Sequence, residues 1–139
     1  MALELNSLRK AVDSLERAIR VAQNNIKGPV DTDHEEVIRA GVIQNFELTY
    51  ELCWKFMKRW LEGNASGAVV DGVTMKELFR MAAERQLIAD VDPWFGYHRN
   101  RNRTTHTYEP SMANEVYESA VRFLGDARKL LEILEAKND

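Results

Sequence analysis

The sequence predicts an all-α fold, an up-and-down bundle of four or five helices. Apolar residues recur in steps of three and four near both ends of the chain, and no segment of useful length alternates apolar and polar residues. The two clearest helices keep an apolar period of about 3.5 residues, which favours near-antiparallel packing at shallow crossing angles. A length of 139 residues suits one domain, spanning 1–139.

The first two helices are marked by an apolar stripe and by a capping motif. The chain breaks after the first stripe at Lys27-Gly28-Pro29, and 32–35 then reads Thr-Asp-His-Glu, a capping box that opens a second helix running to about Glu62. Gly63-Asn64 stops that helix, and the glycine-rich segment 63–72 is expected to be a surface loop. The first stripe consists of Leu8, Val12, Leu15, Ile19, Ala22 and Ile26.

Three further helices are expected in the second half. A second capping box at 74–77 opens a short helix to about Gln86. Asp92-Pro93 pairs an N-cap residue with proline at the first helical position, so a fourth helix begins there. The fifth starts after Pro110 and carries the stripe Val116, Ala120, Phe123, Ala127, Leu130 and Leu134.

The second helix is apolar nearly all the way round, so more than one of its sides must be covered. It therefore either lies at the centre of the bundle or contributes part of a homodimer contact, and the residues do not discriminate between the two.

Composition excludes several classes of protein. The chain is 45% hydrophobic and has 19 basic against 22 acidic side chains, a formal charge of −3 that argues against non-specific coating of nucleic acid. The single Cys53 cannot form an internal disulfide, and the start of the chain lacks a secretory signal, so we expect a cytoplasmic protein. No apolar run approaches the roughly 20 residues that span a bilayer.

The most unusual window is 93–108, which contains three arginines and two histidines but no acid. Arg99, Arg101 and Arg103 make a local cationic surface, and phosphate is its obvious ligand because guanidinium presents a planar fork of donors. The alternative is a solvated basic face paired with acids of neighbouring helices. On charge alone that alternative is favoured.

His106 favours chemistry, because its ordinary pKa of about 6.5 lets it take and give a proton near neutral pH. On a continuous helix Asn102 would lie beside it and orient the ring, whereas Arg101 would lie about 140° away round the helix. Because three threonines are weak helix formers and the residue before Pro110 is pushed out of the helical region, the helix is expected to end near His106. The alternative is a composite site, in which two copies of the segment meet in a symmetric dimer.

An arginine that stabilises charge on phosphorus and a histidine that moves protons are sufficient to cleave RNA without a metal or cofactor. Trp94, Tyr97 and Tyr108 would suit stacking on unpaired bases, although such aromatics are more often core residues.

Two other constellations have simpler interpretations. Glu47 and Glu51 share one face of the second helix, as the carboxylates of a di-iron bundle do. The Glu-x-x-His pairs that such a site also needs are missing from the sequence. We therefore expect Glu51 to pair with Lys55 and to contribute to surface electrostatics. Cys53 lies among apolar residues and is expected to be a small buried hydrophobe.

The run 101–108, Arg-Asn-Arg-Thr-Thr-His-Thr-Tyr, fits Arg-x4-His-x-Tyr and resembles the HEPN superfamily, specifically its HepT-like members. The segment 46–55, Phe-Glu-Leu-Thr-Tyr-Glu-Leu-Cys-Trp-Lys, resembles the nucleotidyltransferase substrate-binding proteins, and together the two resemblances cover nearly the whole chain.

The resemblance implies a dimeric helical bundle with the motif near the dimer axis. It implies a toxin that is a metal-independent ribonuclease acting on RNA such as tRNA, with Arg101 and His106 catalytic and Asn102 supporting. It also implies a partner, a nucleotidyltransferase of the MNT type that acts as antitoxin by transferring AMP to Tyr108. Arg99 fits a looser form of the motif, so either Arg99 or Arg101 is the catalytic arginine.

A second function remains open, that of a non-catalytic substrate-binding subunit of a two-component nucleotidyltransferase. In that case the motif would serve docking, and RNA would remain intact.

Overall fold

The computed structural model describes residues 2–27, 32–64, 70–104 and 110–138. These residues form helices and contain no strand, which confirms the predicted all-α class. The helices are α1 (Asn6–Asn25), α2 (Asp33–Asn64), α3 (Met75–Glu84), α4 (Val91–Asn102) and α5 (Pro110–Lys137).

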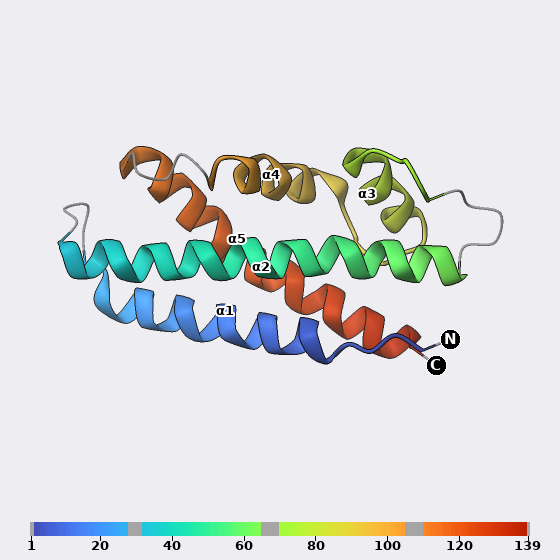
Figure 1. Cartoon of the computed structure of the whole chain (residues 1–139), viewed down its shortest axis with the longest axis horizontal. Helices are drawn as coiled ribbons and strands as arrows, with labels where there is room; N and C mark the ends of the chain where they lie inside the picture. Colours follow the sequence, from blue (N-terminus) through green and yellow to red (C-terminus); the bar gives the residue numbers. More distant parts are fainter. Residues whose placement is uncertain (1, 28–31, 65–69, 105–109, 139) are drawn as a thin grey trace.

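The long α2 forms the axis of the molecule (Figure 1). It contacts each of the other helices: α1 runs antiparallel to it on one side, α3 and α4 lie on the other, and α5 crosses it. Of the two interpretations that the sequence leaves open for α2, the structure shows the one in which this helix lies at the centre of the bundle. Among the described residues it still exposes two large apolar side chains, Val37 at 72% and Leu48 at 56%.

Both predicted capping boxes place their threonines as expected. Thr32 Oγ1 accepts a hydrogen bond from the Glu35 amide at 3.1 Å, and Thr74 Oγ1 accepts one from the Glu77 amide at 3.2 Å. Each bond satisfies one of the amides that have no partner within the first turn of a helix. The starts of α2 and α3 follow from these local bonds.

Helix α4 differs from the prediction at its first residues. Its N-cap is Asp90, whose side chain accepts from the Asp92 amide at 3.2 Å, so Pro93 occupies the third helical position and the predicted Asp92-Pro93 start is two residues late. Proline is tolerated there because the first turn needs no amide donors.

The C-terminal end of α4 also comes earlier than expected, at Asn102 and not near His106. The Thr104 hydroxyl donates to the Arg101 carbonyl at 2.8 Å, and a side chain that bonds to a nearby backbone group in this way competes with the helix. The chain therefore leaves the helix before it reaches the threonine-rich segment.

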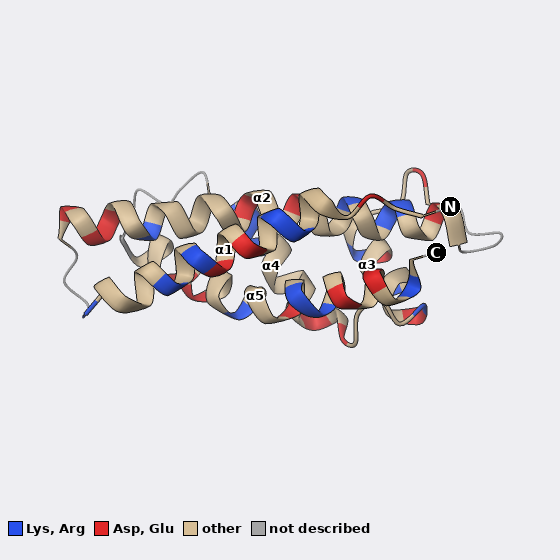
Figure 2. Cartoon of the chain, turned by 90° about the horizontal axis from the view of Figure 1, so that it is seen from below, with Lys and Arg blue, Asp and Glu red and all other residues tan. Residues whose placement is uncertain are grey.

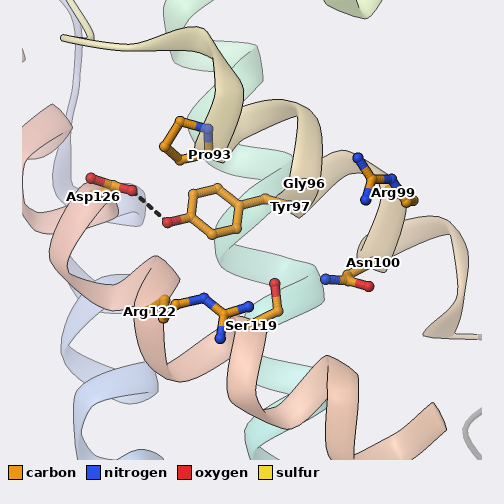
Figure 3. A pocket seen from close by; sticks show the side chains of 8 residues that line it. All are labelled: Pro93, Gly96, Tyr97, Arg99, Asn100, Ser119, Arg122 and Asp126. Carbon is orange, nitrogen blue, oxygen red and sulfur yellow. Dashed lines mark hydrogen bonds between the residues drawn. The ribbon is translucent and has the colours of Figure 1, made fainter.

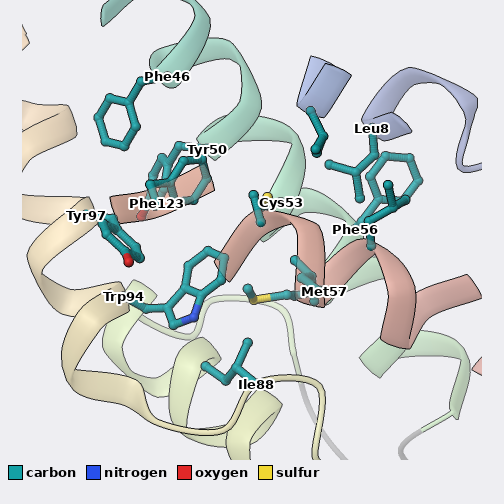
Figure 4. Packing of buried hydrophobic residues seen from close by; sticks show 14 of the residues in the cluster. Leu8, Phe46, Tyr50, Cys53, Phe56, Met57, Ile88, Trp94, Tyr97 and Phe123 are labelled. Carbon is teal, nitrogen blue, oxygen red and sulfur yellow. The ribbon is translucent and has the colours of Figure 1, made fainter. Parts of the chain in front are cut away.

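The core is one cluster with members from all five helices. At its aromatic centre the Phe123 ring on α5 lies 4.9 Å from that of Tyr97, 5.2 Å from Phe46 and 5.7 Å from Trp94, measured between centroids (Figure 4). Trp94 and Tyr97 are 2% and 5% exposed, so the core interpretation, which the sequence favours over stacking on RNA, is confirmed for both. This cluster fixes α4 against α2 and α5.

Acidic and basic residues alternate in short stretches along the helices (Figure 2). The best-defined link between distant helices is Arg128 on α5, which bridges to Asp13 at 3.3 Å and to Glu16 on α1. No helix in the described parts of the chain is both long enough and apolar enough to cross a membrane.

Candidate functional site

The C-terminal half of α4 carries four of the predicted site residues. Arg99, Arg101 and Asn102 lie in its last turn, and Arg103 is its C-cap. His106 and Tyr108 lie outside the described residues. The geometry below therefore concerns the arginine side of the predicted site.

Arg101 lies against α2, between two acidic side chains. Its Nε lies 3.3 Å from Glu51 Oε1 and its Nη1 3.8 Å from Glu47 Oε2. Nη1 also donates to Thr104 Oγ1 at 3.1 Å, and 29% of the side chain is exposed. Glu51 thus pairs with Arg101 across helices and also accepts from Trp54 Nε1 at 3.1 Å, whereas Lys55, its expected partner, lies over the Trp54 ring.

Arg103 has an acidic partner as well, because its Nη1 lies 2.8 Å from Glu115 Oε2 on α5. The interpretation of a basic face paired with neighbouring acids therefore describes part of this surface. The Arg101 side chain is held between its two acidic partners and keeps 29% of its surface exposed.

His98 is the residue that sequence reasoning missed. Its Nδ1 lies 2.8 Å from the Tyr50 hydroxyl, and its Nε2 lies 3.5 Å from Asn102 Nδ2. Helix α4 ends at Asn102, whose side chain lies beside His98, the histidine one turn before it; His106, its predicted i,i+4 partner, lies outside the described residues. The signal was present in the sequence, where the arginines are flanked by two histidines.

The protonation states of this pair follow from burial. Burial, aided by Arg101 and Lys76 and opposed by Glu51, lowers the pKa of His98, so the ring is neutral at pH 7. Burial is also the main reason that the pKa of Tyr50 is raised, so the phenol keeps its proton within hydrogen-bonding distance of Nδ1. His98 is therefore a neutral, oriented imidazole beside the arginine site.

Arg99 belongs to a different surface. Two positions along a helix correspond to about 200°, so Arg99 and Arg101 project from nearly opposite sides of α4. Arg99 lines a cavity of about 500 Å³ between α4 and α5, together with Asn100, Ser119, Arg122 and Asp126 (Figure 3). The two arginines that the motif leaves as alternatives are thus separated by the tertiary structure.

Within the described part of the chain, no three His, Cys, Asp or Glu side chains cluster closely enough to hold a metal ion. Cys53 is fully buried, and burial raises its pKa, so it is a protonated thiol that packs as a small hydrophobe, as predicted.

Comparison with known proteins gives consistent matches over most of the chain. Residues 3–136 match the family model described as nucleotidyltransferase substrate binding protein like. A protein of Haemophilus influenzae named probable ribonuclease HepT is 35% identical over 138 residues, which is 98% of this chain and 94% of that protein.

Two solved structures have the same fold. One, from Haemophilus influenzae, is described as the substrate binding domain of a nucleotidyltransferase; it has a TM-score of 0.86 and 34% identity and covers 95% of this chain and 99% of its own. A Thermus thermophilus crystal structure has a TM-score of 0.73 and 26% identity over 91% of this chain and 98% of that one. The chain therefore belongs to the nucleotidyltransferase substrate binding protein like family.

Proposed function

We propose that this protein is a metal-independent endoribonuclease in which Arg101 and His106 are catalytic and Asn102 supports them. The observation that carries the proposal is the placement of Arg101, which is oriented by Glu47 and Glu51 and remains partly exposed where α4 leads into the segment that bears His106. A relative of 35% identity carries the name probable ribonuclease HepT, which supports the same activity.

The chemistry requires only the RNA and two side chains. The 2′-hydroxyl attacks the adjacent phosphorus while a neutral imidazole takes its proton, and the bond from phosphorus to the 5′-oxygen breaks as that oxygen receives a proton. The guanidinium of Arg101 stabilises the negative charge that grows on the phosphoryl oxygens. Arg103, which pairs with Glu115, is a second guanidinium at the same end of α4, and Arg99 lies on the opposite side of that helix.

The proposed biological setting is a toxin and antitoxin pair. A cognate nucleotidyltransferase of the MNT type transfers AMP to Tyr108, and a bulky anionic group two residues from His106 repels the RNA backbone. We expect Tyr108→Phe to prevent incorporation of labelled AMP when the purified partner and ATP are supplied. Labelling of that variant to the wild-type level would refute Tyr108 as the acceptor.

The proposed active form is a homodimer. The exposed Leu48 lies one helical turn before Glu51, which contacts Arg101, so a contact through this face of α2 would bring two arginine sites together. Sedimentation of the wild type as a dimer and of Leu48→Glu as a monomer is the expected result. A wild type that stays monomeric at micromolar concentration contradicts the dimer.

The second candidate function is a non-catalytic substrate-binding subunit of a nucleotidyltransferase, which is how the related Haemophilus structure is described. The ion pairs of Arg101 and Arg103 favour this second function, because an arginine that is paired with a carboxylate has less charge to offer a reacting phosphate. In this case a stable complex with the partner forms and RNA is not cut.

One gel separates the two candidates. Purified, unmodified protein is incubated with total tRNA in buffer that contains a chelator, beside His106→Ala. Cleavage by the wild type alone is expected. Intact RNA in both lanes, or equal cleavage in both, would overturn the assignment of His106.

A further inference from the structure

Three polar side chains form a chain of contacts that runs from the core to the end of α4. The Tyr50 hydroxyl lies 2.8 Å from His98 Nδ1, and His98 Nε2 lies 3.5 Å from Asn102 Nδ2. One nitrogen of the imidazole therefore faces α2, and the other faces the last residue of α4. Asn102 directly follows Arg101, the proposed catalytic arginine, so the chain of contacts ends at the proposed active site.

The inner end of this chain of contacts is rigid. Tyr50 is 1% exposed and packs among other aromatic rings (Figure 4). Its ring centroid lies 6.2 Å from that of Phe46, 6.3 Å from that of Phe123 and 6.5 Å from that of Phe79. Because a close-packed core allows a side chain few alternative positions, the Tyr50 hydroxyl is a fixed point to which the His98 ring is tied.

The outer end has no other anchor in the described part of the chain. The Asn102 side chain is exposed, and among the described residues it lies within hydrogen-bonding distance of His98 alone. Orienting an exposed side chain costs conformational entropy, so it requires a partner that is itself already oriented. A separation of 3.5 Å is at the outer limit of a hydrogen bond, and such contacts at active sites often tighten only when substrate binds.

We propose that His98 is a positioning residue, which orients the Asn102 amide at the site of RNA cleavage and takes its own orientation from Tyr50. The inference rests on the proposed ribonuclease activity and deepens it, because it adds two residues that lie outside the motif of 101–108.

A neutral imidazole suits this role, because one of its nitrogens donates a hydrogen bond and the other accepts one. With the Asn102 amide as the structure places it, Nδ2 donates to His98 Nε2, and His98 Nδ1 donates to the Tyr50 oxygen. With the amide turned over, both hydrogen bonds reverse their direction together. Protonation makes both ring nitrogens donors, so Asn102 must then present its oxygen to the ring.

The surroundings of His98 keep the ring neutral near neutral pH. The charged groups around it are Glu51 on α2, Lys76 on α3 and Arg101 on α4, and burial with the two cations outweighs the carboxylate and lowers the pKa of His98. The orientation of Asn102 is therefore expected to be lost only in acid.

The first test removes the Tyr50 hydroxyl and leaves the aromatic ring in place. We expect Tyr50→Phe to lower kcat for cleavage of an oligoribonucleotide by up to about 10²-fold with KM little changed, since a misplacement of about 1 Å can cost this much. The matched control is Tyr97→Phe, which removes the hydroxyl of another buried tyrosine, the one that donates to Asp126. This control is expected to cleave at the wild-type rate, and thermal unfolding followed by circular dichroism shows whether both variants are folded.

A double-mutant cycle shows whether the effect passes through Asn102. If it does, Tyr50→Phe and His98→Gln each cost little further activity once Asn102→Ala is present. A merely structural loss would instead add in full to that of Asn102→Ala. Additive losses, or equal activity of Tyr50→Phe and Tyr97→Phe, would overturn the inference.

The contact itself is measured without RNA. In nitrogen-edited NMR spectra of the full-length protein, the Asn102 side-chain amide signals are expected to shift with pH along the titration of His98, and His98→Gln is expected to abolish this shift. An Asn102 amide that does not follow His98 overturns the inference whether or not RNA is cut. Intact RNA with a wild type whose Asn102 amide does follow His98 refutes the ribonuclease proposal alone, so the two failures are distinguishable.

Discussion

Arg101 and Arg128 form a natural pair for separating catalysis from stability. Each guanidinium contacts two carboxylates of a neighbouring helix, Glu47 and Glu51 for Arg101, Asp13 and Glu16 for Arg128. The two side chains are 29% and 33% exposed, so replacing either by alanine removes a similar amount of packing and charge. Only Arg101 lies at the proposed active site.

The expected loss of stability is small. A partly exposed ion pair contributes about 0.2–1 kcal/mol, so two pairs contribute about 0.4–2 kcal/mol. In Arg101→Ala the two glutamates are also left one helical turn apart without their cation, which adds a few tenths of a kcal/mol. For a domain of this size the melting temperature falls by about 3–5 °C per kcal/mol, so both variants remain folded at 25 °C.

The expected loss of activity differs sharply between the two. Removing one group that stabilises charge in a transition state costs about 10²–10³ in rate. We expect Arg101→Ala to lose cleavage of tRNA by this factor, and Arg128→Ala to cleave at close to the wild-type rate. Initial rates on a denaturing gel, with melting curves recorded on the same samples, measure both effects. Equal cleavage by the two variants would refute the role of Arg101, and so would an activity loss explained by unfolding.

Three further predictions concern stability. Phe123→Ala is expected to lower the free energy of unfolding by about 3–5 kcal/mol in urea, because Phe123 lies fully buried among four rings; a loss below about 1 kcal/mol would contradict the packing described. The pKa of His98 is lowered in the folded state, so the folded protein binds fewer protons than the unfolded protein as the pH falls. The contribution of His98 to the free energy of unfolding is therefore complete above pH 6.5 and is lost as the pH falls towards the lowered pKa. His98→Gln should flatten this part of the pH dependence of unfolding, and an unchanged curve would exclude it. Gln86→Gly should stabilise the protein by about 0.5–1 kcal/mol in thermal unfolding, since Gln86 has a φ of 62° at the end of α3; a destabilised variant would show that its side chain matters more than its backbone.

The helices are local features, and local chemistry specified most of them. Apolar steps of three and four, the two threonine caps and the Gly63-Asn64 pair at the end of α2 are all signals within a few residues of where they act. The sequence placed both ends of α4 too late. Asp90 caps the start of the helix through a hydrogen bond to the Asp92 amide, and the Thr104 hydroxyl bonds to the Arg101 carbonyl at its end.

The partners of the arginines are long-range features. Glu47 and Glu51 precede Arg101 by more than a third of the chain, and the contact forms because the ring of Phe123 and its neighbours hold α4 against α2. The spacing of the motif left Arg101 and Arg99 as equal candidates for the catalytic arginine, because a spacing carries no information on which residues pack against each side of a helix.

The sequence by itself determined the fold class, the family and the cationic segment, because periodicity, caps and composition are properties of neighbouring residues. Only the tertiary structure decided that Arg101 faces two carboxylates, that burial lowers the pKa of His98 beside Tyr50, and that Arg99 opens into a cavity with Arg122. The physical reason is that charge pairing, burial and cavities depend on which helix faces come together, and that is fixed by packing between segments far apart in the chain.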